Sequence, residues 1–140
     1  MRFNVIVICL SALATLHLPD RGDAQTQPSA RERFASPQAG EAPDFQKHVA
    51  PLLGRLGCNG RSCHGYFQGR GGFRLSLFGY DFKMDHAALI ARSSSENESR
   101  VNRTAANDSL IIRKPSRQVD HEGGQLFERG SWQHHLFQRW

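Results

Sequence analysis

Apolar and polar positions divide the chain into three parts. Val5 to Leu16 form an almost continuous apolar run, Gln25 to Pro43 contain Phe34 as their only large apolar residue, and apolar residues recur in groups from Asp44 to Trp140. A run of about a dozen residues is short of the roughly 20 that span a bilayer. The pattern predicts a signal peptide at 1–24, a flexible linker at 25–43 and one folded domain at 44–140.

The first 24 residues have the layout of an export signal. Arg2 precedes the apolar run, and Gly22-Asp-Ala24 offers small residues for cleavage. Cleavage there would remove Cys9 and leave two cysteines in the exported chain. We expect a protein of the periplasm or cell envelope, with retention of the apolar run as an N-terminal anchor as the alternative.

Apolar residues at helical spacing predict a first helix over 44–56. Asp44 is placed to cap this helix, Pro51 is expected to kink it, and Gly57 is expected to end it. Its apolar positions are Phe45, Val49, Leu52, Leu53 and Leu56. We expect this face to cross the last helix of the domain.

The rest of the domain is expected to hold shorter helices. Asp85 is a candidate cap for a second helix, 110–112 form a brief third one, and Ser131 is placed to cap a last helix that runs to Trp140. Phe45, Val49 and Leu52 would then meet the last helix through Trp132 and Leu136. Alternation of apolar and polar residues over 73–78 gives a weak signal for an extended segment. The prediction is a mostly α domain.

The formal net charge of +5 comes from basic residues that are scattered, with no run of five. No nucleic-acid-binding motif accompanies them, so we expect no nucleic-acid partner. A solvated surface explains the scatter. The alternative is a basic rim that attracts an acidic partner protein over long range.

Cys58-Asn-Gly-Arg-Ser-Cys63-His64 is the segment with the most specific chemistry. Two cysteines followed at once by a histidine attach haem covalently, and the usual spacing is C-x-x-C-H. Here the spacer has four residues, so an extra loop must be absorbed. Asn59 and Gly60 both tolerate left-handed backbone angles and are expected to form it. The segment predicts thioether bonds from the cysteines and an axial iron bond from His64.

Three other interpretations of this segment stay open. Cys58 and Cys63 could form a local disulfide in an oxidising compartment. Zinc could bind Cys58, Cys63 and His64 with a fourth ligand, although adjacent Cys-His ligands suit a tetrahedral site poorly. A catalytic thiolate is the third, but nothing marks either cysteine as an activated nucleophile.

The second axial position of a haem iron has two candidate ligands in this sequence. Met84 lies 20 residues after His64, and His121 lies in Asp120-His-Glu-Gly-Gly124, where glycines let the backbone approach a flat ligand. The remaining histidines of the domain are expected to be surface or packing residues: His48, His86, His134 and His135.

A series of short motifs runs in order along the domain: Asp44-Phe-x3-Val49-x-Pro51-Leu-Leu, Leu56-Gly-Cys-Asn, Cys63-His-Gly65, Gln68-Gly-x-Gly-Gly-Phe73, Leu75-Ser-Leu, Gly79-Tyr-Asp81, Arg100-Val-Asn-Arg103, Ser109-Leu-Ile-Ile-Arg-Lys-Pro115, His121-x-Gly-Gly124 and Arg139-Trp140. Together they resemble the cytochrome c domain of planctomycete-type proteins, in its branch with the long cysteine spacer. The resemblance covers about 44–140, nearly the whole exported chain.

The resemblance implies a class I cytochrome c-like helical domain around one covalent haem c. Cys58 and Cys63 match the thioether residues, His64 the proximal ligand and His121, by position, the distal ligand. The implied function is one-electron transfer with a redox partner protein, in a domain that usually opens a longer polypeptide. Two alternatives remain: a peroxidase- or oxidase-like module with an open distal position, and a haem-free binding domain held by a disulfide.

Overall fold

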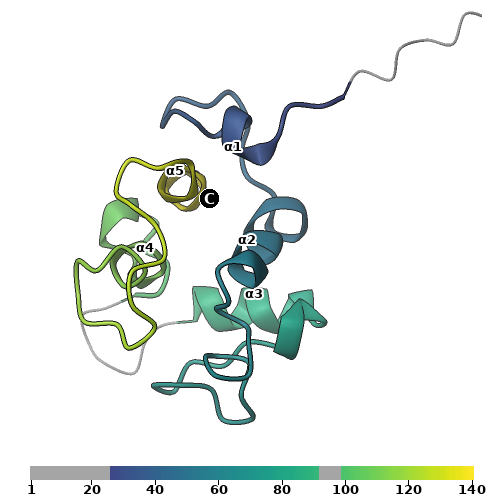
Figure 1. The fold of residues 1–140 in the computed structure, drawn as a ribbon, viewed down its shortest axis with the longest axis vertical. Coiled ribbons are helices and arrows are strands. Elements are labelled where there is room, and N and C mark those ends of the chain that lie inside the picture. The colour runs from purple at the N-terminus through teal and green to yellow at the C-terminus, as the bar shows by residue number, and fades with distance from the viewer. Residues whose placement is uncertain (1–25, 92–98) are drawn as a thin grey trace, which may run out of the picture.

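A computed structural model describes residues 26–91 and 99–140. Over these ranges the chain is mostly helical and has no β-strand, with one isolated antiparallel bridge between Arg70 and Phe73 (Figure 1). The prediction of a small, mostly α domain is therefore confirmed. The predicted signal peptide lies outside the described residues. Within them, no helix has the length and apolar character to cross a membrane.

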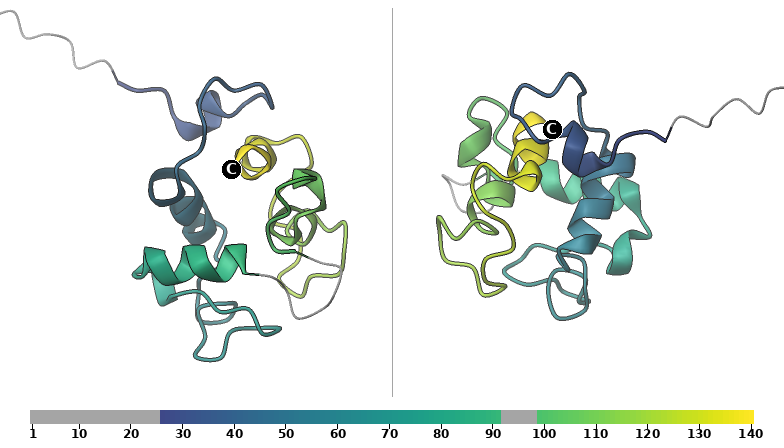
Figure 2. Two further views of the ribbon diagram at one scale, coloured as in Figure 1. Left: turned by 180° about the vertical axis from the view of Figure 1, so that it is seen from behind. Right: turned by 45° about the horizontal axis from the view of Figure 1, so that its top comes forward.

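The helical segments are short and are joined by long turns. In chain order they are α1 (Ala30–Arg33), the π-helical η1 (Phe45–Val49), α2 (Ala50–Arg55), the 3-10 helix η2 (Leu77–Gly79), α3 (Phe82–Ile90), the 3-10 helix η3 (Ala106–Asp108), α4 (Leu110–Arg113) and α5 (Trp132–Arg139). Helix α5 contacts α1, η1, η3 and α4. The last helix thus joins the first third of the chain to the last third, as the two views of Figure 2 show.

The predicted first helix is two consecutive segments, η1 and α2. Asp44 caps η1, because its Oδ1 accepts a hydrogen bond of 2.8 Å from the Lys47 amide. The Val49 amide donates to the Asp44 carbonyl at 3.3 Å, a spacing of five residues. Pro51 follows at the start of α2, where its missing N–H is tolerated. The kink expected at Pro51 takes the form of a change from π-helical geometry in η1 to α-helical geometry in α2, one residue before the proline.

Gly57 ends this helix, as predicted. Its φ is +77°, its amide donates to Gly54 at 3.0 Å, and the Cys58 amide donates to Leu53 at 2.9 Å. These two bonds form a Schellman motif, which satisfies the last carbonyls of the helix. The helix end therefore sets the position at which Cys58 leaves α2.

The predicted flexible linker is wrong for most of its length, because residues 29–43 pack on the domain. Ser29 and Glu32 form a capping box that starts α1, and Phe34 is fully buried. Arg139 donates to the carbonyls of Pro37 at 3.2 Å and Glu41 at 3.3 Å. The single large apolar residue of the segment fills a place in the core, so the domain begins near Ser29 and not at Asp44.

Asp85 does not cap α3. The cap is Asp81, whose Oδ1 accepts from the Met84 amide at 2.9 Å. Asp85 lies inside the helix and is buried, where it accepts from the amide of Ser76 at 2.5 Å and from its hydroxyl at 2.7 Å. An aspartate with both oxygens hydrogen-bonded is stable inside a helix, and sequence spacing does not reveal that partner.

The predicted extended segment at 73–78 is not a strand. Leu75 is buried and Arg74 is exposed, as the alternation predicts, but Ser76 is also buried. The backbone of this segment bonds to residues 58–64, which we call the motif loop. The Leu75 amide donates to the His64 carbonyl at 2.8 Å, and the Phe78 amide donates to the Asn59 carbonyl at 3.1 Å. The segment thus braces the cysteine-histidine loop where a strand would pair with a neighbouring strand.

The two remaining predicted helices are present. Ser109 occupies the N-cap position of α4 without a side-chain cap, because its Oγ instead accepts from the Asn102 amide at 2.8 Å. Ser131 caps α5, and its Oγ accepts from the His134 amide at 3.4 Å.

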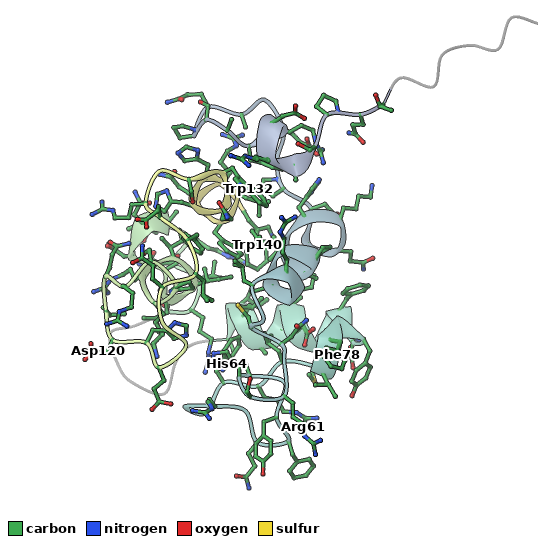
Figure 3. The ribbon with its side chains drawn as sticks, in the orientation of Figure 1. Arg61, His64, Phe78, Asp120, Trp132 and Trp140 are labelled. Carbon is green, nitrogen blue, oxygen red and sulfur yellow. The ribbon has the colours of Figure 1, made fainter. Side chains whose placement is uncertain are left out.

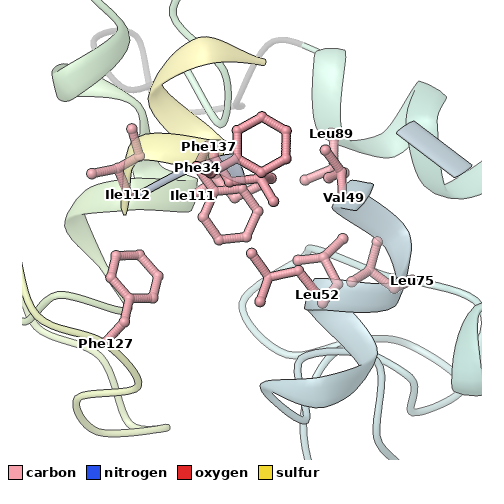
Figure 4. Packing of buried hydrophobic residues seen from close by; sticks show 11 residues of the cluster. Phe34, Val49, Leu52, Leu75, Leu89, Ile111, Ile112, Phe127 and Phe137 are labelled. Carbon is pink, nitrogen blue, oxygen red and sulfur yellow. The ribbon is translucent and has the colours of Figure 1, made fainter. Parts of the chain in front are cut away.

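One apolar cluster holds these elements together (Figure 4). Val49 and Leu136 are fully buried, and the rings of Phe45 and Trp140 lie 5.5 Å apart between centroids. The predicted crossing of the first and last helices is therefore confirmed, and it runs through η1. All five residues expected at this crossing belong to the cluster or pack against it: Phe45, Val49, Leu52, Trp132 and Leu136.

Candidate functional site

Both cysteines of the motif and both candidate histidines line one cavity of about 480 Å³. Cys58, Cys63 and His64 come from the loop after α2, and His121 comes from the loop between α4 and α5. A second cavity, of about 210 Å³, shares Cys58, His64 and His121. Its other walls include core side chains: Leu53, Phe73, Leu89, Ile111 and Phe137. The joint size and apolar walls suit a small-molecule or cofactor site.

The motif loop is closed by backbone hydrogen bonds. The His64 amide donates to the Cys58 carbonyl at 3.0 Å, and the amides of Cys63 and Gly65 both donate to the Gly60 carbonyl at 3.0 Å. These bonds bring His64 back beside Cys58 across the four-residue spacer. A longer spacer therefore still places both cysteines and the histidine at one cavity.

The predicted left-handed bulge at Asn59 and Gly60 is wrong, because neither residue has a positive φ. The extra residues are absorbed as consecutive turns after the left-handed Gly57. The residue that the loop requires to be glycine is Gly65: a Cβ there would lie 2.1 Å from the Asn59 carbonyl oxygen. The backbone preferences of single residues predicted Gly60 as the essential glycine. Gly65 is essential instead because of its contact with Asn59, six residues earlier.

The two cysteines are free thiols. Burial raises the pKa of the Cys58 thiol to about 12, and the nearby Cys63 acts in the same direction. Cys58 is therefore protonated at neutral pH, which disfavours a catalytic thiolate at this position. The structure forms no disulfide between Cys58 and Cys63.

His64 is held by a carbonyl from the segment that follows the motif. Its Nδ1 lies 3.0 Å from the carbonyl oxygen of Phe73, and the two rings lie 4.6 Å apart between centroids. A carbonyl only accepts hydrogen bonds, so Nδ1 carries the proton and Nε2 of the neutral ring has the free lone pair. Burial lowers the pKa of His64, the contacts with the carbonyls of Phe73 and Arg70 oppose that shift, and the nearby His121 and Lys114 add to it.

His121 has the same arrangement in a different loop. Its Nδ1 lies 3.0 Å from the Gly124 carbonyl oxygen, so Nδ1 again carries the proton. A Cβ at Gly123 would lie 2.8 Å from Cε1 of this ring. The glycine pair therefore supplies both the acceptor and the space for the imidazole.

The donor set suits an extended ligand better than a single ion. Among the described residues, no three histidine, cysteine, aspartate or glutamate side chains come together to hold a metal ion. The zinc interpretation therefore lacks a ligand set in this part of the chain. Two imidazoles and two thiols around one cavity can bond an extended ligand at several points.

Met84 lies on α3 and lines neither cavity, so the structure brings His121 to the site and leaves the methionine outside it. The other histidines also lie away from both cavities, in keeping with their expected packing roles. His48, for example, accepts from the Asp44 amide at 2.8 Å and lies 3.2 Å from Glu41.

The sequence did not show which of its scattered basic side chains lie at the cavity. Lys114 and Arg70 line both cavities, and Arg100 lies over the Phe73 ring at 4.8 Å. Arg70 also forms an ion pair of 2.7 Å with Glu122, which joins the segment after the cysteine-histidine motif to the His121 loop. These residues come from three distant segments, and only the fold gathers them.

The site thus has a fixed pair of imidazoles, two thiols, apolar inner walls and a basic margin. Comparisons of the chain with protein-family models, with curated proteins and with solved structures found no match.

Proposed function

We propose that this chain is an exported c-type cytochrome domain with a class I cytochrome c-like fold, which transfers single electrons through one covalently attached haem. The observation that carries the proposal is the matched pair of histidines. Nδ1 of His64 and Nδ1 of His121 each lie 3.0 Å from a backbone carbonyl, and both rings line the cavity of the two cysteines. A histidine fixed through Nδ1 is ready to bind a metal through Nε2.

Cys58 and Cys63 would hold the haem through thioether bonds, with His64 as the proximal ligand and His121 as the distal ligand. Because burial lowers the pKa of His64, this ring is neutral at physiological pH and needs no deprotonation before it binds iron. When bound, the haem iron supplies the one-electron redox change.

The remaining residues of the site would control the surroundings of the haem. Phe73, Leu89 and Phe137 line the smaller cavity and would give the haem apolar neighbours, which influence its reduction potential. Arg70 and Lys114 lie where they can neutralise carboxylate groups of a ligand. We further propose an exported, periplasmic or cell-envelope location, and an acidic redox partner attracted by the net charge of +5.

The direct test is expression of the full chain together with a c-type maturation system. Covalent attachment leaves haem on the denatured band, adds the mass of haem to the chain and protects both Cys58 and Cys63 from alkylation. The matched control replaces both cysteines, Cys58→Ala with Cys63→Ala, and should lose the stain. A colourless denatured band with two alkylated thiols would contradict the proposal.

A second measurement tests the histidine geometry without any haem. Long-range proton–nitrogen correlation NMR of the haem-free protein distinguishes the two neutral tautomers of each imidazole. We expect the Nδ1–H form for both His64 and His121, because each donates to a carbonyl. The Nε2–H form at either ring would remove the basis for that ligand.

A further inference from the structure

Four aromatic side chains beside the motif loop project into solvent. Phe67 and Phe78 are each 78% exposed, Tyr80 is 74% exposed and Tyr66 is 51% exposed. Phenylalanine is usually buried, and clustered exposed aromatic rings mark interaction sites. We name these four residues the aromatic surface.

The aromatic surface consists of two pairs of residues, Tyr66 with Phe67 and Phe78 with Tyr80. Both pairs lie beside the backbone carbonyl of Asn59. The Phe78 amide donates to the Asn59 carbonyl at 3.1 Å, and Gly65 packs against that same oxygen. Tyr66 follows Gly65 directly, so both pairs of rings leave the fold beside Asn59. Figure 3 shows Phe78 and Arg61 toward the end of the molecule that lies away from α1.

Phe78 adopts a backbone conformation that is unfavourable for its side chain. Its φ is +58° and its ψ is +14°, in the left-handed region, where a bulky residue is strained. Packing of the ring does not compensate, because most of the ring lies in solvent. A glycine would suit this turn better, so the position of the Phe78 ring points to a role outside the fold.

The segment that carries these rings is basic. Residues 55–84 contain five basic residues and one acidic residue, a net charge of +4. Arg61, Arg74 and Lys83 are exposed, and the Arg74 guanidinium lies 5.8 Å from the Phe67 ring centroid. The one acidic residue, Asp81, is engaged as the cap of α3. The occupant of this surface is therefore expected to be anionic.

We propose that the aromatic surface binds the headgroup region of a membrane that contains anionic phospholipids. Phe67, Phe78 and Tyr80 line neither of the cavities described above and project together from neighbouring turns into solvent. A soft lipid interface accepts such rings, and aromatic residues are enriched at that depth. Basic side chains add attraction to anionic headgroups. The binding requires no haem.

The test measures, by tryptophan fluorescence, whether a single position of the protein inserts into a lipid bilayer. Phe78→Trp places a fluorophore on the aromatic surface, and Ala35→Trp places one on the exposed segment after α1, at the other end of the molecule (Figure 1). Full-length protein is mixed with vesicles of phosphatidylglycerol and phosphatidylcholine that carry brominated acyl chains. We expect quenching of Phe78→Trp above the wild-type background of Trp132 and Trp140, and none above it for Ala35→Trp.

Phe78→Gly separates a binding role from a structural one. Glycine is unstrained at this φ, so thermal stability should stay equal or rise, while the apparent affinity of the aromatic surface for anionic vesicles falls about tenfold. Arg61→Gln and Arg74→Gln should each weaken it about fivefold, with a smaller effect at high salt.

Absence of quenching for Phe78→Trp in anionic vesicles at low salt would overturn the proposal and assign the surface to an acidic protein instead. Quenching that is equally strong with pure phosphatidylcholine would overturn the anionic preference. A Phe78→Gly variant that unfolds more easily would make the ring a structural element and also overturn the proposal.

Discussion

The two loops that present His64 and His121 reach a similar geometry by different means. His64 bonds through its amide to Cys58, through its carbonyl to Leu75 and through Nδ1 to Phe73, nine residues away. His121 bonds through Nδ1 to the Gly124 carbonyl and through its own carbonyl to the Gly124 amide, only three residues away. The first loop is fixed by its surroundings, and the second is a local turn.

This difference separates the roles that the two histidines would have. A side chain held by several distant segments moves only if the core moves with it, whereas a local turn can rearrange alone. The His121 loop is attached to the rest of the fold at its base, where the Leu126 amide donates to Pro115 at 2.8 Å. We therefore expect His64 to be the permanent ligand and His121 the exchangeable one.

Gly65→Ala should have the largest effect on stability, because it disrupts the loop that carries His64. The new Cβ would meet the Asn59 carbonyl oxygen at 2.1 Å, and both groups belong to the backbone. We expect the free energy of unfolding to fall by about 3 kcal/mol or more, together with loss of haem attachment. Urea unfolding measures the first effect and haem staining the second.

Gly40→Ala is the matched control, since no atom lies within 4 Å of a Cβ there. Its stability should stay within about 0.5 kcal/mol of wild type. If Gly65→Ala were as stable as this control, the motif loop would be as adaptable as the His121 loop.

His64→Ala and His121→Ala compare the two proposed ligands directly. With attached haem, His64→Ala should remove the permanent axial bond and leave a high-spin, weakly held group. His121→Ala should keep the covalent haem and change only the low-spin spectrum, which imidazole in solution should restore. Visible absorption spectra of both variants decide the matter. An unchanged low-spin spectrum in His121→Ala would transfer the distal role to Met84.

Gly123→Ala tests the local turn without removing its histidine. The added Cβ would lie 2.8 Å from Cε1 of His121, a side-chain atom that can rotate away. We expect a loss of less than about 1 kcal/mol in stability, but a displaced His121 ring and a weakened distal bond. The readouts are urea unfolding and the low-spin absorption bands, and a stability loss as large as that of Gly65→Ala would show that the two loops are equally constrained.

The pH dependence of the haem-free protein should give the smallest effect. Burial lowers the pKa of His64 and of His134 below their ordinary value of 6.5, and the nearby His135 and Arg129 add to the shift at His134. The unfolded chain then binds more protons in acid, so stability is present above pH 6.5 and is lost as the pH falls through the lowered values.

Urea unfolding at several pH values measures this acid slope. His64→Gln should reduce the slope strongly. His121→Gln should reduce it only slightly, by removing its contribution to the lowered pKa of His64. Equal reductions in the two variants would contradict the contrast between the loops.

Local features of the sequence predicted the ends of several elements correctly. Asp44 and Ser131 cap their helices and Gly57 ends another, because each bonds to groups within three to five residues. Asp85 and the Asn59-Gly60 pair were misassigned for the opposite reason. The burial of Asp85 against Ser76, and the contact of Gly65 with Asn59, come from chain segments brought together by folding.

The sequence by itself determined the mostly helical class, the caps at Asp44 and Ser131 and the spacing of Cys58, Cys63 and His64. Only the tertiary structure decided that residues 29–43 belong to the domain and that His121, 57 residues after His64, lines the same cavity while Met84 does not. The physical reason is the sequence separation of the interactions involved. Caps and turns depend on hydrogen bonds between near neighbours, whereas a cavity is lined by segments whose meeting depends on the packing of the whole core.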